Sequence, residues 1–100
     1  MPGYRFSLPA KLDLIEIADY TVDTWGAEQA NRYVDSLYEC LELLSKSPGI
    51  GRACNDIREG YRRFEHKKHV IFYRVEGDGI FVVRVLHQRM LPSRHLFMDV

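Results

Sequence analysis

The sequence predicts an α+β fold in which a helical hairpin packs on one face of a small antiparallel sheet, in the order β-α-α-β-β-β. Three patterns carry this prediction. A short alternating run opens the chain, two helical patterns separated by a glycine follow, and three strand-like runs joined by tight turns come after them. A chain of 100 residues suits one hydrophobic core, so we expect a single domain over residues 1–100.

The first strand and the first helix meet near Pro9. Residues 4–8 alternate apolar and polar side chains, which is typical of a half-buried strand. Pro9 suits the first turn of a helix, because its missing N–H would have no partner there anyway. We expect a helix over residues 10–25, ended by Gly26, with a core-facing stripe formed by Leu12, Leu14, Ile15, Ala18, Val22 and Trp25.

The second helix, predicted over residues 27–46, has the most regular pattern in the chain. Its apolar residues recur at alternating spacings of three and four and form a narrow seam: Ala27, Ala30, Val34, Leu37, Leu41 and Leu44. The short connection requires an antiparallel hairpin. Ile17, Tyr20 and Tyr38 fall outside the two stripes. Such side chains either pack between the helices and the sheet or stay exposed for a partner.

Turn residues at 47–51 stop the second helix, and a loop over residues 52–57 leads to three strands. We expect these strands at residues 60–66, 69–76 and 80–87, with the middle strand apolar on both faces and therefore central. Two short turns join them, Lys67-Lys68 and the hairpin turn Gly77-Asp78-Gly79. Residues 92–97 are compatible with one helical turn. We expect the sheet face opposite the hairpin to be partly free and to carry basic residues.

The net charge of zero conceals two unlike halves. Residues 1–50 carry 4 basic and 8 acidic side chains, whereas residues 51–100 carry 10 basic and 6 acidic ones and all 4 histidines. This split favours two partner surfaces of opposite character, although the charges could also only solvate exposed faces. The two cysteines match no metal or redox spacing, and nothing indicates a metal or another cofactor. We expect a cytoplasmic, reduced protein.

Arginines and histidines in the second half allow a metal-independent ribonuclease as one hypothesis, because such residues can move protons and stabilise a phosphorane. Alternation places His66 on the strand face of Arg62. It places His87 with Phe81, Val83 and Val85. No pair is fixed by spacing into an acid–base couple, so we assign no catalytic residue.

Local segments resemble the ParE branch of the RelE/ParE superfamily of bacterial toxins, over nearly the whole chain. They are LIEIADY at 14–20 with Trp25-Gly26 after it, SPGIGR at 47–52, DIREGYRRF at 56–64 with HVIFYR at 69–74, and VLHQRM at 85–90. The resemblance implies a RelE/ParE-like fold and a non-enzymatic toxin of a type II toxin–antitoxin system. It implies inhibition of DNA gyrase and neutralisation by a ParD-type antitoxin. Contact with nucleic acid would then occur only through the gyrase complex.

The alternative is a ribosome-dependent mRNA endoribonuclease of the RelE type. Such enzymes commonly keep a tyrosine or histidine near the chain end, whereas here Gln88 follows His87 and no aromatic residue lies between His87 and His95. That departure favours ParE, although His66, His69 and His87 could still converge.

Two sets of residues are our candidates for partner contact. We expect the target-facing surface to include Arg58, Arg62, His87, Arg89 and Met90, and the antitoxin-facing surface to include Ile17, Tyr20 and Tyr38. Arg58 or Arg62 could instead anchor the sheet through buried hydrogen bonds.

Overall fold

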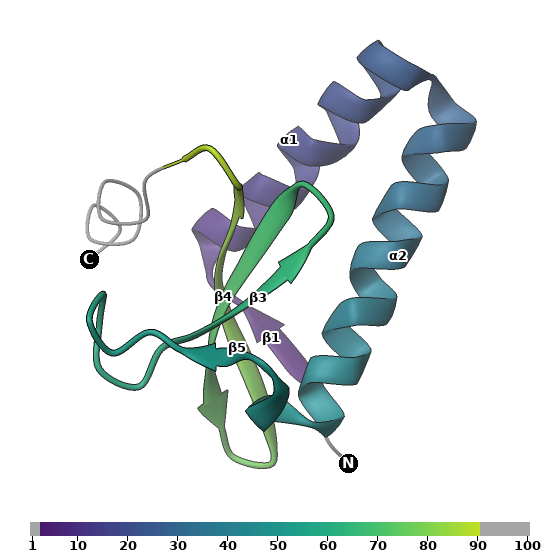
Figure 1. Ribbon diagram of the computed structural model, residues 1–100. Coiled ribbons are helices and arrows are strands. Elements are labelled where there is room, and N and C mark those ends of the chain that lie inside the picture. Colours follow the sequence, from purple (N-terminus) through teal and green to yellow (C-terminus); the bar gives the residue numbers. More distant parts are fainter. Residues whose placement is uncertain (1–2, 91–100) are drawn as a thin grey trace.

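The computed structural model describes residues 3–90, in which two helices pack on a five-stranded sheet (Figure 1). The predicted α+β fold and its order of elements are confirmed, with one strand added. Within residues 3–90 the strand order in the sheet is β1-β5-β4-β3-β2. The helical turn expected at residues 92–97 lies outside the described residues. The elements are β1 (Tyr4–Phe6), α1 (Leu8–Trp25), α2 (Ala27–Lys46), the 3-10 helix η1 (Pro48–Ile50), β2 (Arg52–Ala53), β3 (Arg62–His66), β4 (His69–Glu76) and β5 (Gly79–His87).

The expectation of a wholly antiparallel sheet is wrong at one pair of strands. β1 runs parallel to β5, with Tyr4 beside Ile80 and Phe6 beside Val82, whereas β2, β3, β4 and β5 pair antiparallel. Alternation of side chains shows that a strand is half buried but says nothing of its direction. The direction of β1 follows from the path of the chain, which crosses through both helices before it returns to the sheet.

The start of α1 is fixed by Ser7. Its hydroxyl oxygen accepts from the Ala10 N–H at 3.1 Å, and its hydroxyl donates to the Val83 carbonyl at 2.6 Å. The first bond caps the helix, and the second ties this cap to the sheet. Pro9 lies in the first turn as predicted, and the helix begins at Leu8. Gly26, at φ 90°, ends α1 and precedes α2, because glycine tolerates this backbone angle.

The face that α1 turns to the core differs from the predicted stripe. Its buried residues are Ala10, Asp13, Leu14, Ile17 and Thr21, while Leu12, Ile15, Val22 and Trp25 are exposed. The prediction was wrong because it assumed that the most apolar face is the buried one. In this helix a carboxylate, Asp13, takes a core position and binds Arg84 of β5.

Asp13 also completes the edge of β5 beyond the end of β1. The Val82 carbonyl accepts from the Ser7 N–H at 3.0 Å, and the Val85 N–H donates to Oδ2 of Asp13 at 3.0 Å. The N–H and hydroxyl of Ser7 and the carboxylate of Asp13 thus take the backbone bonds that a longer β1 would have made. This arrangement fixes α1 against the sheet.

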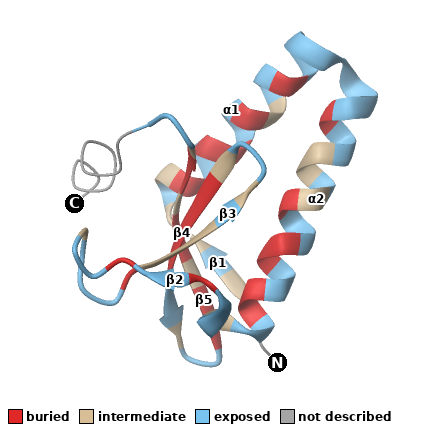
Figure 2. Cartoon of the chain, in the orientation of Figure 1, coloured by how far each residue is buried: buried red, intermediate tan, exposed pale blue. Residues whose placement is uncertain are grey.

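Figure 2 shows buried residues along β4 and in both helices. Apolar residues are buried on both faces of the sheet. On the helix side, Leu37, Leu41 and Leu44 of α2 pack with Ile71 and Tyr73 of β4. The opposite face has a smaller cluster of its own, formed by Cys54, Ile57, Tyr61, Val70, Phe72, Phe81, Val83 and Leu86. The loop between β2 and β3 supplies the first three of these residues. The opposite face is therefore less free than the sequence suggested.

A β-bulge in β5 changes which residues share a face. Phe72 lies opposite Arg84 and Tyr73 opposite Val82, so Val83 is the extra residue. Before the bulge Val82 faces the helices, and after it Val85 does. Val83 and Leu86 lie on the opposite face. The alternation predicted for His87 with Phe81 and Val83 is therefore wrong.

Candidate functional site

Three histidines meet under the helical hairpin, at the end of the sheet that holds the turn between β3 and β4. His66 and His69 flank this turn, and His69 lies opposite His87 because of the bulge. The rings of His69 and His87 have centroids 5.5 Å apart, edge to face. Tyr33 of α2 lies within hydrogen-bond distance of Nδ1 of His69, at 2.5 Å. The structure thus brings together the three histidines whose convergence the sequence left open.

The electrostatics favour neutral rings at His66 and His69 at pH 7. Burial, followed by the charges of His87 and His66, lowers the pKa of His69 to about 4. Burial also lowers the pKa of His66 and raises that of Tyr33. A general base works best with a pKa near the operating pH, so His69 is a weak base in this setting.

A pocket of about 350 Å³ opens beside the histidines. Its walls come from the far end of the helical hairpin and from the β3–β4 turn. The lining residues are Tyr20, Thr21, Trp25, Gln29, Tyr33, Lys67, Lys68, His69 and His87. We call it the histidine pocket.

A second surface runs along the outside of α1. Leu8, Leu12, Ile15 and Val22 follow one another at spacings of four, three and seven, and they are between 44% and 69% exposed. This outer seam has the periodicity of a helix that packs against another helix. It borders a groove of about 450 Å³ lined by Phe6, Lys11, Leu14, Ile15, Ala18, Val34 and Tyr38. The exposed carboxylates Glu16, Asp19 and Asp23 lie on the same helix.

A third surface, the arginine face, lies on the side of the sheet away from the helices. Arg74 and Arg5 stack on Phe81, with guanidinium carbons 4.5 and 5.9 Å from the ring centroid. Arg63 stacks on Phe72 at 5.4 Å. Stacking on rings holds the guanidinium groups in place. Arg5 and Arg74 also pair with Glu76, at 3.0 and 3.6 Å, so part of the positive charge of this face is offset. The members of the arginine face are Arg5, Arg52, Arg58, Arg63 and Arg74.

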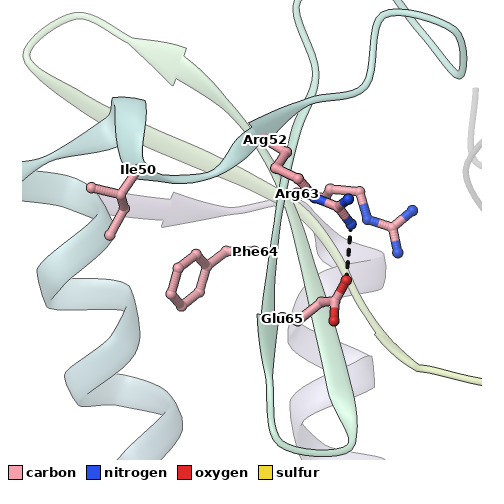
Figure 3. Close-up of a pocket in the computed structure, with 5 residues that line it drawn as sticks. All are labelled: Ile50, Arg52, Arg63, Phe64 and Glu65. Carbon is pink, nitrogen blue, oxygen red and sulfur yellow. Dashed lines mark hydrogen bonds and ion pairs between the residues drawn. The ribbon is translucent and has the colours of Figure 1, made fainter.

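Figure 3 shows the edge of this face at a shallow pocket lined by Ile50, Arg52, Arg63, Phe64 and Glu65. Arg52 lies opposite Arg63 in the register of β2 and β3. Arg52 pairs with Glu65 at 2.9 Å, while Phe64 points to the other side of β3 (Figure 3). Two like charges directly opposite each other repel, and the Glu65 carboxylate offsets part of this repulsion.

The five residues predicted to face the target do not share one surface. Arg58 is exposed, with its guanidinium carbon 5.9 Å from the ring centroid of Tyr61. Arg89 and Met90 are exposed just after β5. His87 instead lines the histidine pocket. Arg62 anchors the loop before β2, since it donates to the Gly51 carbonyl at 2.7 and 3.1 Å and to that of Gly49 at 3.2 Å.

The three residues predicted for antitoxin contact are also separated. Ile17 is 8% exposed and belongs to the core, Tyr20 lines the histidine pocket, and Tyr38 lines the groove beside the outer seam. Sequence reasoning missed the outer seam, because it placed Leu12, Ile15 and Val22 in the core. The signal was present as two different apolar faces on one helix.

The part of the chain from residue 3 to residue 90 holds no group of three or more histidine, cysteine or carboxylate side chains that could bind a metal. Cys40 and Cys54 are buried, and burial raises the pKa of both thiols. Neither helix is long and apolar enough to cross a membrane.

Comparison with known proteins agrees with this architecture. The sequence profile of the family described as ParE toxin of type II toxin-antitoxin system, parDE, matches residues 4–92. Toxin ParE1 of Mycobacterium tuberculosis is 48% identical over 94 residues, which are 93% of this chain and 96% of that protein. Toxin ParE1 of Caulobacter vibrioides is 43% identical over 96 residues, covering 96% of this chain and 99% of that protein.

A solved structure, described as the chromosomal ParDE toxin–antitoxin system from P. aeruginosa, superposes with a TM-score of 0.72 at 25% identity. The superposition covers 87% of this chain and 96% of the other. The chain therefore belongs to the ParE toxin family of type II toxin–antitoxin systems.

Proposed function

We propose that this protein arrests growth by binding and inhibiting DNA gyrase in the cytoplasm, and that a ParD-type antitoxin neutralises it. The observation that carries the proposal is membership of the ParE family together with two unlike exposed surfaces. One is the apolar outer seam with its acidic neighbours, and the other is the arginine face. A toxin that must bind two different partners needs two such surfaces.

The outer seam suits the antitoxin. An amphipathic segment of the antitoxin would place apolar side chains against Leu12 and Ile15, beside the groove at Tyr38. Basic residues on that segment would then lie near Glu16 and Asp19, which favours the pairing. Of the residues predicted from the sequence, Tyr38 keeps this role. Ile17 has little surface to offer.

The arginine face suits the target. Guanidinium groups recognise carboxylates and phosphates through paired hydrogen bonds, and gyrase bound to cleaved DNA offers both. Arg58 belongs to this face, and we assign target contact also to Arg89 and Met90, which are exposed just after β5. Binding of this kind needs no residue with a tuned pKa, which is consistent with a non-enzymatic toxin.

The alternative function, a ribosome-dependent mRNA endoribonuclease, is favoured by one observation. His66, His69 and His87 converge near two lysines, and these are parts from which a ribonuclease can be built. The depressed pKa of His69 counts against it, because that ring would take up a proton only well below pH 7.

The decisive experiment incubates the purified toxin with gyrase, ATP and supercoiled or relaxed plasmid. We expect accumulation of cleaved DNA complexes and loss of supercoiling, and both effects should vanish when the antitoxin is added first. A parallel reaction follows mRNA in a translating extract. Two results together would support the ribonuclease instead: gyrase stays active in the presence of the toxin, and the toxin cleaves mRNA. The variant His87→Ala should then abolish that cleavage.

A further inference from the structure

The histidine pocket is built from flat rings and polar groups. Its described walls contain the rings of Tyr20, Trp25, Tyr33, His69 and His87, and none of its described lining residues is leucine, isoleucine, valine or methionine. Tyr20 and Trp25 are 68% and 63% exposed, so their ring faces are open to solvent. Such walls favour a planar ligand that stacks on the rings. They are less suited to an aliphatic side chain, which would need an apolar cavity.

The charge of the pocket is positive. Lys67 and Lys68 lie on its rim, and none of its described lining residues is acidic. Nζ of Lys67 lies 5.6 Å from the centroid of the Tyr33 ring, which holds the ammonium group over the pocket wall. With His69 and His66 neutral at pH 7, the two lysines supply the charge there.

The turn that presents these lysines is held in an uncommon shape. Lys67 has φ 53°, in the left-handed region that favours glycine, at the first central position of the two-residue turn between His66 and His69. The Gln88 N–H donates to the Lys68 carbonyl at 2.9 Å and ties the turn to the end of β5. A positive φ at this position is what a two-residue hairpin turn requires, so the turn fixes where the two lysines lie beside the pocket.

Hydrogen bonding also orients the wall of the pocket. Burial raises the pKa of Tyr33, so its hydroxyl is protonated and can donate to Nδ1 of neutral His69. That tautomer carries its hydrogen on Nε2, where it can serve as a donor.

We propose that the histidine pocket binds single-stranded nucleic acid, with a base stacked on Trp25 or Tyr20 and the adjoining phosphates at Lys67 and Lys68. Exposed rings beside lysines are the usual means by which proteins hold single strands without reading sequence. The pocket volume of about 350 Å³ lies within the range of small-ligand sites. An acidic peptide would satisfy the lysines but would leave the open rings without a flat partner.

This proposal goes beyond gyrase inhibition and does not depend on it. The test therefore uses the purified toxin alone, with a short fluorescein-labelled oligothymidylate and fluorescence anisotropy over a range of salt concentrations. We expect binding by the wild type. The double variant K67Q/K68Q should lower the slope of log K against log salt by about 1.4, since each phosphate contact on a single strand contributes about 0.7.

The control K11Q/K46Q removes the same charge at exposed lysines that do not line the pocket, and it should keep the slope of the wild type. Substitutions of Trp25 distinguish stacking of a base on an aromatic ring from simple apolar contact. Trp25→Leu should weaken binding about tenfold, whereas Trp25→Phe should retain most of it. An oligoribonucleotide arm shows whether the site distinguishes RNA from DNA.

Three results would each overturn the proposal. They are no binding by the wild type, equal losses in K67Q/K68Q and K11Q/K46Q, and displacement of the oligonucleotide by oligoglutamate at a lower concentration than by unlabelled oligothymidylate. The last result would assign the pocket to an acidic polypeptide. Absent oligonucleotide binding together with intact gyrase inhibition would remove this inference and leave the proposed function standing.

Discussion

Arg84 of β5 donates two hydrogen bonds to Asp13 of α1, from Nε to Oδ2 at 2.7 Å and from Nη2 to Oδ1 at 2.8 Å. Both side chains are largely buried, at 14% and 10% exposed. Oδ2 of Asp13 also accepts from the Val85 N–H. One carboxylate thus joins helix and sheet by three hydrogen bonds.

Replacing Asp13 should destabilise the fold severely. Asp13→Ala removes one partner of a buried charge pair and leaves the Val85 N–H without its acceptor, so we expect the free energy of unfolding to fall by about 3–5 kcal/mol. Urea denaturation followed by circular dichroism measures this. The matched control is Glu28→Ala, which breaks the exposed pair with Arg32 and should cost less than about 0.5 kcal/mol. Similar costs for both variants would contradict the assignment.

Gly51 should tolerate no side chain, whereas nearby Gly49 should. A Cβ on Gly51 would lie 2.1 Å from the Tyr73 hydroxyl, which itself donates to the Pro48 carbonyl at 2.6 Å and accepts from the Gly51 N–H. A Cβ on Gly49 would meet nothing within 4 Å. We expect Gly51→Ala to cost about 1–3 kcal/mol in the same denaturation assay. Gly49→Ala should be close to neutral, and a reversed order would contradict this account.

Stability should depend on pH through His69. Its pKa is about 4 in the folded protein and near 6.5 when unfolded, so the unfolded chain binds more protons between these values. The contribution of neutral His69 is therefore fully present above pH 6.5 and is lost as the pH falls toward 4. We expect urea midpoints to drop across this window, and to drop less in His69→Gln. His66, His87, Lys68 and Asp13 interact with the ring and stay unchanged in that comparison. Equal slopes for the two proteins would refute the prediction.

Antitoxin binding should depend on the outer seam. Ile15→Asp places a charge in the centre of this exposed stripe, and we expect the affinity for the antitoxin to fall at least about tenfold without loss of fold. Leu43→Asp is the matched control, since Leu43 is 51% exposed on α2 and does not line the groove. Calorimetric titration of both variants with the antitoxin measures the difference. If the Ile15→Asp variant bound the antitoxin as tightly as the wild type, the outer seam would be excluded as the antitoxin-binding surface.

Gyrase inhibition should depend on the arginine face. Arg74 is exposed, stacks on Phe81 at 4.5 Å and lies 3.6 Å from a carboxylate oxygen of Glu76, so Arg74→Ala removes a positioned charge from this face. We expect about tenfold more toxin to be needed for half-maximal loss of supercoiling. Arg32→Ala removes the same charge from α2 and should leave the titration unchanged. If both variants lose potency equally, gyrase inhibition depends on the net charge of the toxin and not on the arginine face.

Local sequence patterns were enough for most of the fold. The bounds predicted for α2 and β4 agree with the structure, because a regular seam and a run of apolar β-branched and aromatic residues leave few alternatives. The short β2 was missed, since two exposed residues, Arg52 and Ala53, carry no pattern. The orientation of α1 was wrong because Asp13 is buried through a partner more than seventy residues away.

The candidate sites were harder to predict for the same reason. Arg62 and Arg58 are near neighbours in sequence, yet Arg62 reaches backbone carbonyls before β2 while Arg58 stays exposed. No local pattern distinguishes these roles. The grouping of His69 with His87 depends on an irregularity in strand pairing that side-chain alternation cannot reveal.

That irregularity has a consequence for how the gene can change. Because Val83 is an extra residue, the last part of β5 shows its side chains with the opposite alternation to the first part. Loss of the single codon for Val83 would restore a regular ladder and leave His87 opposite His69, because the pairs on either side of the bulge already follow one another. Loss of the codon for Leu86 would instead place His87 opposite Val70, on the arginine side. Relatives that keep the pocket should therefore keep the length of β5 after the bulge even where its sequence has drifted.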